Sequence, residues 1–355
     1  MRVDQLVPAF HRGDAIGDTA SHLKAFFISQ GYESEIYCLE RDEGLEKESC
    51  LFEEFVSPSS SDVTILHFAL VSPLSKKLIS FESKKIIIYH NITPENFFTG
   101  YSEEMVRISR LSREELKSLA PDTDLALGDS EFNRRELDDM GFKNTEVLPL
   151  FIDFSRYERP HNTFLYDLFR DERTNILFVG RIVPNKKIEE LIKVVFYYKK
   201  YISPLVRLII IGKTSSLPKY YHCLIRMADE FYLKPEEICF TGHIPDDEMY
   251  ALYKASDVFL SLSEHEGFGL PFLESMVFDL PIIAFDCTAV PFTLDGAGVL
   301  IKNKNVDHVG ELVDIIAKNN DLRKNLIDGQ SQRLLRFKKF QRETFLLRQI
   351  EQLLK

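Results

Sequence analysis

The stretch of residues 264–276, EHEGFGLPFLESM, constrains the fold of this chain more than any other. The apolar run of residues 258–262 before it has the length of a buried strand, and residues 272–280 after it carry the spacing of a helix. We therefore expect a strand, a tight turn and a helix that begins near Pro271. In parallel α/β sheets such turns lie at the carboxyl ends of strands, where these folds bind ligands.

The turn itself combines groups that bind anions and sugars. Pro271 suits the first helical position, and Leu270 before it has no side-chain oxygen to cap the helix. We therefore expect free N–H groups there, and together with the helix dipole these favour phosphate oxygens or sugar hydroxyls. Gly267 and Gly269 allow close backbone approach, although glycines after a strand also simply make turns.

Two glutamates add acceptors to this turn. Glu266 and Glu274 are eight residues apart, so we expect both to project toward the same ligand. A glutamate in a first helical turn also simply complements the helix dipole. The combination of glycines, uncapped helix and paired carboxylates favours a ligand site over that plainer interpretation.

A second motif follows the strand-like run of residues 176–179. It reads Gly-Arg-Ile-Val-Pro-Asn-Lys-Lys over residues 180–187 and leads into residues with helical apolar spacing. Cations at a helix N-terminus oppose the helix dipole unless an anion lies between them. Arg181, Lys186 and Lys187 are therefore candidates for binding a phosphate group.

Together, these motifs resemble the retaining glycosyltransferases of family 4, which have the GT-B fold. The resemblance implies that Glu266 lies near the transferred sugar and that Glu274 holds the ribose hydroxyls of the nucleotide. It assigns the donor diphosphate to Arg181 and Lys186, with Lys187 as the alternative by one residue of slippage. The backbone implied to touch sugar and phosphate is that of Gly267, Phe268, Gly269 and Leu270.

The resemblance implies three further contacts, and it fails at one place. Gly17, in the loop of residues 10–18, would cover the donor phosphates or simply form a turn, and Ile244 would contact the nucleotide base. His90 is the best match for a histidine that faces the donor sugar, with His11 second; a structural role for either stays open. At residues 287–292, relatives commonly have glycine followed by Pro-Glu, which this chain lacks.

Length and rhythm predict two domains. A chain of 355 residues is too long for one core, and strand-like runs alternate with helical ones, as in parallel sheets with crossovers. The resemblance implies two Rossmann-like domains whose parallel sheets face each other across an interdomain cleft: an acceptor-side domain over residues 1–155 and a donor-binding domain over residues 156–339. We place the linker at about residues 155–174, where the chain is charged and lacks a clean period. The resemblance also implies that the helix of residues 340–355 packs back on the first domain.

Composition and motif context argue against several classes of protein and site. The net charge of −11 argues against nucleic acid as a partner. The five cysteines form no Cys-x-x-Cys pair, so neither a disulfide framework nor a zinc site is indicated. Asp122-Thr123-Asp124 matches a metal motif of the other large glycosyltransferase fold, but its context favours a solvated turn. The first strand begins almost at Met1 and no apolar run reaches membrane-span length, so we expect a cytoplasmic protein.

The resemblance thus implies a retaining glycosyltransferase, and we expect it to be metal-independent and without a cofactor. Its donor would be a UDP- or GDP-linked sugar, and its acceptor a glycan, lipid-linked or other hydroxyl in cell-surface polysaccharide or glycoconjugate assembly. The alternatives are a nucleotide-sugar epimerase on the same fold and a non-catalytic partner of another transferase. A basic, apolar tail predicts either a solvated face or contact with the inner face of a membrane; its residues include Arg333, Arg336, Phe337, Lys338, Lys339, Phe340 and Arg342.

Overall fold

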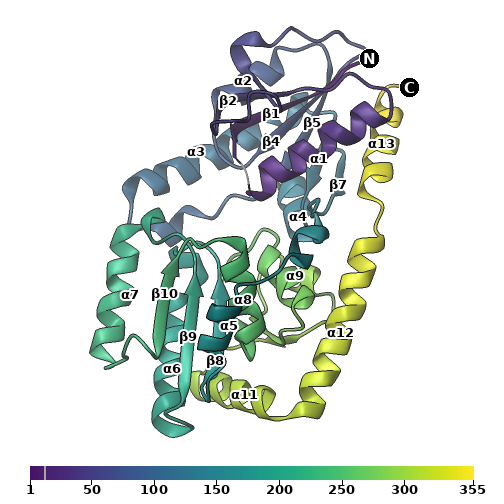
Figure 1. The fold of residues 1–355 in the computed structure, drawn as a ribbon. Helices are drawn as coiled ribbons and strands as arrows, with labels where there is room; N and C mark the ends of the chain where they lie inside the picture. Colours follow the sequence, from purple (N-terminus) through teal and green to yellow (C-terminus); the bar gives the residue numbers. More distant parts are fainter. Residues whose placement is uncertain (12) are drawn as a thin grey trace. The chain divides into compact units, whose positions relative to one another are not determined.

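The computed structural model describes residues 1–11 and 13–355; Arg12, part of the loop with the expected Gly17 contact, lies outside the described residues. Contacts divide the chain into two compact units. In Figure 1, the purple start of the chain and its yellow last helix both belong to unit 1. Unit 1 comprises Met1–Asn96, Glu104–Asp153 and Phe340–Lys355; unit 2 comprises Phe97–Glu103 and Phe154–Lys339.

Unit 1 is built on a parallel sheet. Over its described residues the sheet has seven strands in the order β3-β2-β1-β4-β5-β6-β7, and every adjacent pair is parallel. The order reverses direction between β1 and β4, as in doubly wound folds. The strands are β1 (Val3–Phe10), β2 (Ile36–Arg41), β3 (Cys50–Leu51), β4 (Val63–Phe68), β5 (Lys84–Tyr89), β6 (Leu125–Gly128) and β7 (Thr145–Val147).

Helices cover both faces of this sheet because its strands are apolar on both faces. Ile86 and Ile88 of β5 share a core cluster with Leu346 of the last helix, whereas Ile87 and Tyr89 belong to a second cluster. The alternation follows from the two-residue period of a strand, and burial on both faces is typical of parallel sheets. The helices are α1 (Ala15–Ser29), α2 (Pro73–Ile79), α3 (Glu103–Leu119), α4 (Glu131–Asp139) and α13 (Arg342–Leu353).

Unit 2 repeats the design. Its described residues form a six-stranded parallel sheet in the order β10-β9-β8-β11-β12-β13, which reverses direction between β8 and β11. The strands are β8 (Thr174–Val179), β9 (Val206–Ile211), β10 (Ile238–Gly242), β11 (Val258–Ser261), β12 (Ile282–Phe285) and β13 (Val299–Ile301). The helices are α5 (Thr163–Phe169), α6 (Ile188–Tyr201), α7 (Pro218–Glu230), α8 (Asp246–Ala255), α9 (Leu270–Val277), α10 (Val290–Leu294), α11 (Val306–Lys318) and α12 (Asn320–Lys339). Two parallel-sheet α/β units confirm the expected fold class.

Three local expectations need correction. Helix α1 begins at Ala15, inside the stretch of residues 10–18 that we expected to be a loop, because the Asp14 carboxylate caps it by accepting from the N–H of Gly17 at 2.6 Å. The residue before helix α9 is Gly269 instead of Leu270. The expected linker is not irregular throughout, since it contains the 3₁₀ turn Phe154–Glu158 and helix α5, whose cap Asn162 accepts from Leu165 N–H at 3.0 Å.

The basic tail is not one continuous charged face. In helix α12, Arg333 is buried and donates to the carbonyl of Thr293 at 2.9 Å, and Arg336 pairs with Asp295 at 3.1 Å. Phe337 is buried as well, at 3 % exposure. These residues therefore serve packing within unit 2. Across the described part of the chain, no helix combines the length and apolar composition needed to cross a bilayer.

Candidate functional site

The two sequence motifs meet at the point where the sheet of unit 2 reverses direction. Strands β8 and β11 are hydrogen-bonded neighbours, so the loops at their carboxyl ends leave the sheet side by side. Asn185, in the loop after β8, joins them. The side-chain amide of Asn185 donates to the backbone carbonyl of His265 at 2.9 Å, and the backbone carbonyl of Asn185 accepts from the N–H of Glu264 at 2.8 Å. The two motifs are thus held together at the position between β8 and β11 where the strand order reverses.

An ion pair links the motifs directly. The ammonium of Lys186 lies 2.7 and 2.6 Å from the two carboxylate oxygens of Glu266. Both side chains are mostly buried, at 16 % and 10 % exposure, so the pair is weakly screened by solvent. Of the two adjacent lysines, Lys186 is therefore the one that pairs with Glu266, which is also the lysine that the resemblance implies.

Lys187 takes part in a second, neighbouring ion cluster. Its ammonium lies 3.1 Å from Glu264, which also pairs with Lys304 at 2.8 Å. Burial raises the pKa of Glu264, but the hydrogen bonds from Lys304 and Lys187 outweigh it and hold that pKa below its usual value. Lys187 also lies 3.9 Å from Glu189, so three lysines face three glutamates across these ion pairs. Glu264 and Lys304 were not singled out from the sequence. The one available signal for Lys304 was its position in the loop that follows the strand ending at Ile301.

Thr288 fixes the backbone of Glu266. Its hydroxyl accepts from the N–H of Glu266 and donates to the carbonyl of the same residue, both at 2.8 Å. Thr288 has φ 42°, a left-handed conformation uncommon for a β-branched residue. It belongs to the segment where the chain departs from its apparent relatives. The segment that differs from the relatives therefore holds the backbone of Glu266 in place through Thr288. Sequence reasoning did not indicate this role.

The start of helix α9 has the geometry of an anion site. Gly269 has φ 86°, and a Cβ there would lie 2.6 Å from the Phe272 ring, so only glycine fits. Among the described residues no side chain caps this helix, as expected from the sequence. Of the other turn residues, Phe268 is buried at 5 % exposure, while Gly267 and Leu270 are half-buried.

Glu274 is held from the protein side. Tyr157 and Tyr253 donate their hydroxyls to its two carboxylate oxygens at 3.0 and 2.8 Å. The residue is 7 % exposed, and burial raises the pKa of its carboxyl, opposed by the two tyrosine hydrogen bonds. Both tyrosines were missed by sequence reasoning, because neither lies near Glu274 in the chain.

The two remaining donor-side candidates, Arg181 and Ile244, differ in exposure. The Arg181 side chain is exposed, and it has no ion pair within the described residues. Its guanidinium is thus accessible to a ligand. Ile244 is half-buried in the loop after β10. For both residues, ligand contact stays a prediction.

In unit 1, His90 belongs to a buried relay of hydrogen bonds. The Gln5 amide donates to the Ala20 carbonyl at 2.9 Å, so its oxygen accepts from His67 Nε2 at 2.9 Å. His67 Nδ1 must then accept from His90 Nε2, at 3.0 Å. His90 Nδ1 lies 3.0 Å from an Asp129 oxygen, so this last pair shares one proton.

This relay bears on the expected role of His90. Its side chain is 5 % exposed, and both ring nitrogens are engaged inside unit 1. A contact with a donor sugar through a ring nitrogen would require one of these bonds to break. His11, the second candidate, is 46 % exposed and pairs with Asp42 at 2.8 Å.

Two other sequence features have structural roles. Gly17 lies in the first turn of α1, where a Cβ would meet the His11 carbonyl oxygen at 2.2 Å and where the N–H already bonds Asp14. Asp124 fastens the start of β5 by accepting from the N–H of Lys85 at 2.8 Å. Within the described residues, no cluster of three or more His, Cys, Asp or Glu side chains could hold a metal ion.

Comparison with known proteins links the second unit to one family. Residues 167–333 match the model of group 1 glycosyl transferases. The serotype-specific mannosyltransferase WbdA of Escherichia coli is 27% identical over 139 residues, which is 39% of this chain and 17% of the relative. The alpha-monoglucosyldiacylglycerol synthase of Acholeplasma laidlawii is 30% identical over 148 residues, or 41% of this chain and 35% of the relative. The matched segments thus span only a minor part of these relatives.

Solved structures match the chain over nearly its whole length. HepE of Anabaena, in complex with UDP-glucose, has a TM-score of 0.73 at 15% identity and covers 99% of this chain and 98% of its own. WaaG, a glycosyltransferase involved in lipopolysaccharide biosynthesis, has a TM-score of 0.70 at 12% identity, with 99% of both chains covered. At such identities the likeness concerns the fold alone, and it confirms the GT-B fold.

Proposed function

We propose that the chain is a glycosyltransferase that moves a sugar from a nucleotide-diphosphate donor to an acceptor hydroxyl. One observation carries the proposal: the Lys186–Glu266 ion pair lies where the Gly-Arg loop, the paired-glutamate turn and the uncapped start of α9 meet. Cations and free N–H groups favour a diphosphate, while carboxylates accept from sugar hydroxyls. The match of residues 167–333 to group 1 glycosyl transferases supports the same reading.

Each part of the site has a role in this proposal. Lys186, Arg181 and the start of α9 stabilise the charge that grows on the departing diphosphate. Glu266 lies near the transferred sugar, and Glu274 accepts from the ribose hydroxyls. Ile244 contacts the base, and the backbone of residues 267–270 contacts sugar and phosphate.

The reaction proceeds with retention and without a metal ion in this proposal. The leaving diphosphate accepts the proton of the attacking hydroxyl on the same face of the sugar. Because the cationic loop already balances the diphosphate charge, no divalent ion is needed for that purpose. Asp124 belongs to the Asp-x-Asp sequence that could suggest a metal site, but its carboxylate accepts from the N–H of Lys85 at the start of β5.

The acceptor is a glycan or a lipid-linked hydroxyl. Support comes from the names of the relatives, which include mannosyltransferases and a synthase of a glucosylated diacylglycerol. The donor carries UDP or GDP: HepE was solved with UDP-glucose, and one relative of Mycobacterium tuberculosis is named as GDP-mannose-dependent.

A thermal-shift panel of UDP-, GDP- and ADP-sugars tests the donor site. A ligand that binds only the native state at a hundred times its Kd stabilises it by about 2.7 kcal/mol. We expect one nucleotide series to raise the Tm of the wild-type chain, and Lys186→Met to lose most of that shift while Lys187→Met keeps it. If no nucleotide sugar shifts the wild-type Tm at millimolar concentration, the proposed function fails; if one does and Lys186→Met keeps the full shift, the donor site is not in this turn.

A further inference from the structure

The two tyrosines on Glu274 make the hydrogen bonds that a ribose would make. A phenolic hydroxyl donates one hydrogen bond to a carboxylate oxygen, as a sugar hydroxyl does. In the structure Tyr157 donates to Oε1 at 3.0 Å and Tyr253 donates to Oε2 at 2.8 Å. A carboxylate so deeply buried has little open space around it. A ribose that reaches Glu274 must therefore share or replace one of these two donors.

Tyr253 is built into the core of unit 2. It lies within helix α8, has no solvent exposure, and its ring stacks on Phe278 with centroids 5.0 Å apart and an interplanar angle of 20°. It also lies 6.5 Å from the Phe259 ring of β11, nearly parallel to it. Moving this ring would open a cavity in a packed core, which is strongly unfavourable for a large aromatic side chain. Its bond to Glu274 is thus a fixed part of the fold.

Tyr157 sits on a much less constrained element. It belongs to the five-residue 3₁₀ turn Phe154–Glu158, which directly follows the residue where the chain passes from unit 1 to unit 2. Tyr157 itself is buried at 5 % exposure, and Arg156 before it pairs with Asp246 at 3.3 Å, but Ser155 and Glu158 of the same turn are exposed. Its ring contacts are edge-on or tilted: Tyr250 at 5.8 Å, Phe278 at 5.9 Å and Phe154 at 6.3 Å. A short turn of this kind can shift at lower cost than a helix in the core.

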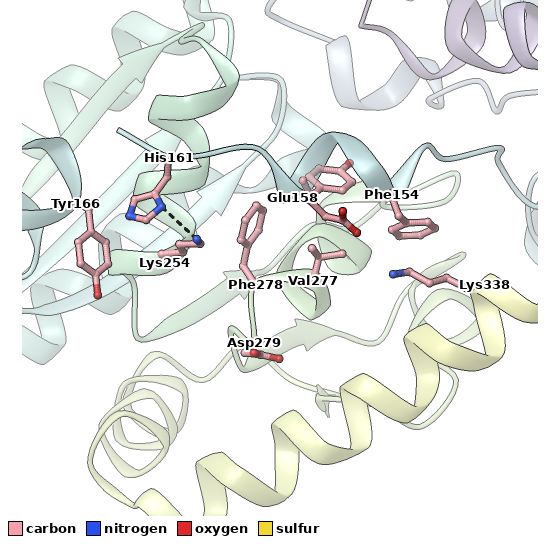
Figure 2. Close-up of a pocket in the computed structure, with 10 residues that line it drawn as sticks. Phe154, Glu158, His161, Tyr166, Lys254, Val277, Phe278, Asp279 and Lys338 are labelled. Atoms are coloured by element: carbon pink, nitrogen blue, oxygen red, sulfur yellow. Dashed lines mark hydrogen bonds between the residues drawn. The ribbon is translucent and has the colours of Figure 1, made fainter. Parts of the chain in front are cut away.

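A pocket of about 610 Å³ adjoins Tyr157. Figure 2 shows Phe278 and Val277 in its centre, with the hydrogen-bonded pair His161–Lys254 on one side and Phe154 with Lys338 on the other. The ammonium of Lys338 lies 4.5 Å from the centroid of the Phe154 ring. Tyr157 already lines this open pocket together with the aromatic rings of Phe154, Tyr166 and Phe278, so the pocket offers room and ring contacts for a displaced aromatic ring.

We propose that Tyr157 competes with the donor ribose for Glu274, and that donor binding displaces its hydroxyl and turns its ring toward the adjoining pocket. This inference rests on the proposed function, because it takes Glu274 as the ribose acceptor. In this view Tyr157 keeps the carboxylate hydrogen-bonded until a donor arrives. Its hydroxyl lowers the apparent donor affinity by the fraction of molecules in which it holds Oε1.

The test is calorimetric titration of UDP and GDP into wild type and two matched variants. Tyr157→Phe keeps the ring and deletes the competing hydroxyl, so it should bind the cognate nucleotide about 2- to 10-fold more tightly. Tyr253→Phe deletes the hydroxyl on the other oxygen but leaves Tyr157 in place, so it should show no tightening. A purely structural role for Tyr157 would make its loss weaken binding.

A fluorescence experiment follows the movement itself. The chain contains no tryptophan, so Phe154→Trp introduces a single reporter next to Tyr157 at the pocket. Saturating nucleotide should change its emission in the Phe154→Trp protein, and the change should shrink when Tyr157→Phe is added, because that ring is no longer held on Glu274 beforehand.

The outcomes separate this inference from the function on which it rests. If wild type binds UDP or GDP and Tyr157→Phe binds with equal or weaker affinity, the competition is disproved while the donor site stands. If wild type binds neither nucleotide, the proposed function fails and takes this inference with it.

Discussion

At the scale of single residues, the site depends on which of two adjacent lysines faces the paired-glutamate turn. Lys186 contacts Glu266, whereas Lys187 shares Glu264 with Lys304. A shift of one residue along the loop thus changes the ion-pair partner of the lysine from Glu266 to Glu264. The resemblance suggested Lys186, and the ion pairs give the physical reason that the two lysines differ.

Replacing each lysine by alanine tests this assignment. Lys186→Ala should lower kcat by about 10²–10³, because it removes a preorganised charge next to the leaving diphosphate. Lys187→Ala should change kcat little, since Glu264 keeps Lys304 as a partner. Steady-state kinetics with the cognate donor measures both, and melting curves confirm that each variant folds. The reverse pattern, with Lys187→Ala crippled and Lys186→Ala active, would show that the register is wrong by one residue.

Thr288 is the second residue whose role can be isolated. Thr288→Val removes both hydrogen bonds to the Glu266 backbone while keeping the shape of the side chain. We expect kcat to fall about 10- to 100-fold, because a carboxylate misplaced by about 1 Å loses its catalytic orientation. Thr288→Ser retains the hydroxyl and should stay near wild type. Equal activity of the serine and valine variants would refute this positioning role.

At the scale of elements, the sequence predicted the parts that local signals determine. The apolar run of residues 63–68 predicts a strand, and the acidic start at residue 246 predicts a helix over residues 246–255; the structure has both elements with these bounds. Strand β3 was missed because it is only two residues long, and α2 because a serine-rich, polar stretch surrounds it. The start of α1 was misplaced because the cap at Asp14 precedes the apolar pattern.

The turn before α9 provides a test of local conformation. Gly269→Ala should destabilise unit 2 by more than the ~1–2 kcal/mol of a left-handed alanine, because its Cβ would also overlap the Phe272 ring. Gly31→Ala is the matched control: φ is +84° there, and nothing lies within 4 Å of the added Cβ. Urea unfolding of both variants measures the difference. Equal losses would mean that Phe272 yields without cost.

The histidine relay across β4 and β5 makes stability depend on pH. Burial, and next the neighbouring His90, hold the pKa of His67 well below its usual value. Unfolded His67 takes up a proton below about pH 6.5 that the native state does not, so stability falls as pH drops through that range, by at most about 1.4 kcal/mol per pH unit. His67→Gln should flatten this loss in urea titrations between about pH 7 and 5, while the exposed control His11→Gln should not. An unchanged acid slope in His67→Gln would exclude this group as a source.

At the scale of the whole molecule, two parallel-sheet units form a GT-B fold, and the site motifs follow from the point where one sheet reverses direction. Those motifs were readable because each is contiguous in sequence. Their supports were not: Thr288 lies 22 residues from Glu266, and Tyr157 lies 117 residues from Glu274. The engagement of His90 by His67 was equally hidden, because it depends on two strands lying side by side.

The most direct test of the account is a transfer assay with the purified chain. UDP- and GDP-sugars are supplied with oligosaccharide and lipid-linked acceptors in the presence of EDTA, and released nucleotide and new glycosidic bonds are followed together by NMR. We predict one nucleotide released per sugar transferred, with the anomeric configuration of the donor retained in the product. Conversion of the donor to another nucleotide sugar without an acceptor, or donor binding without turnover on any acceptor, would contradict the account.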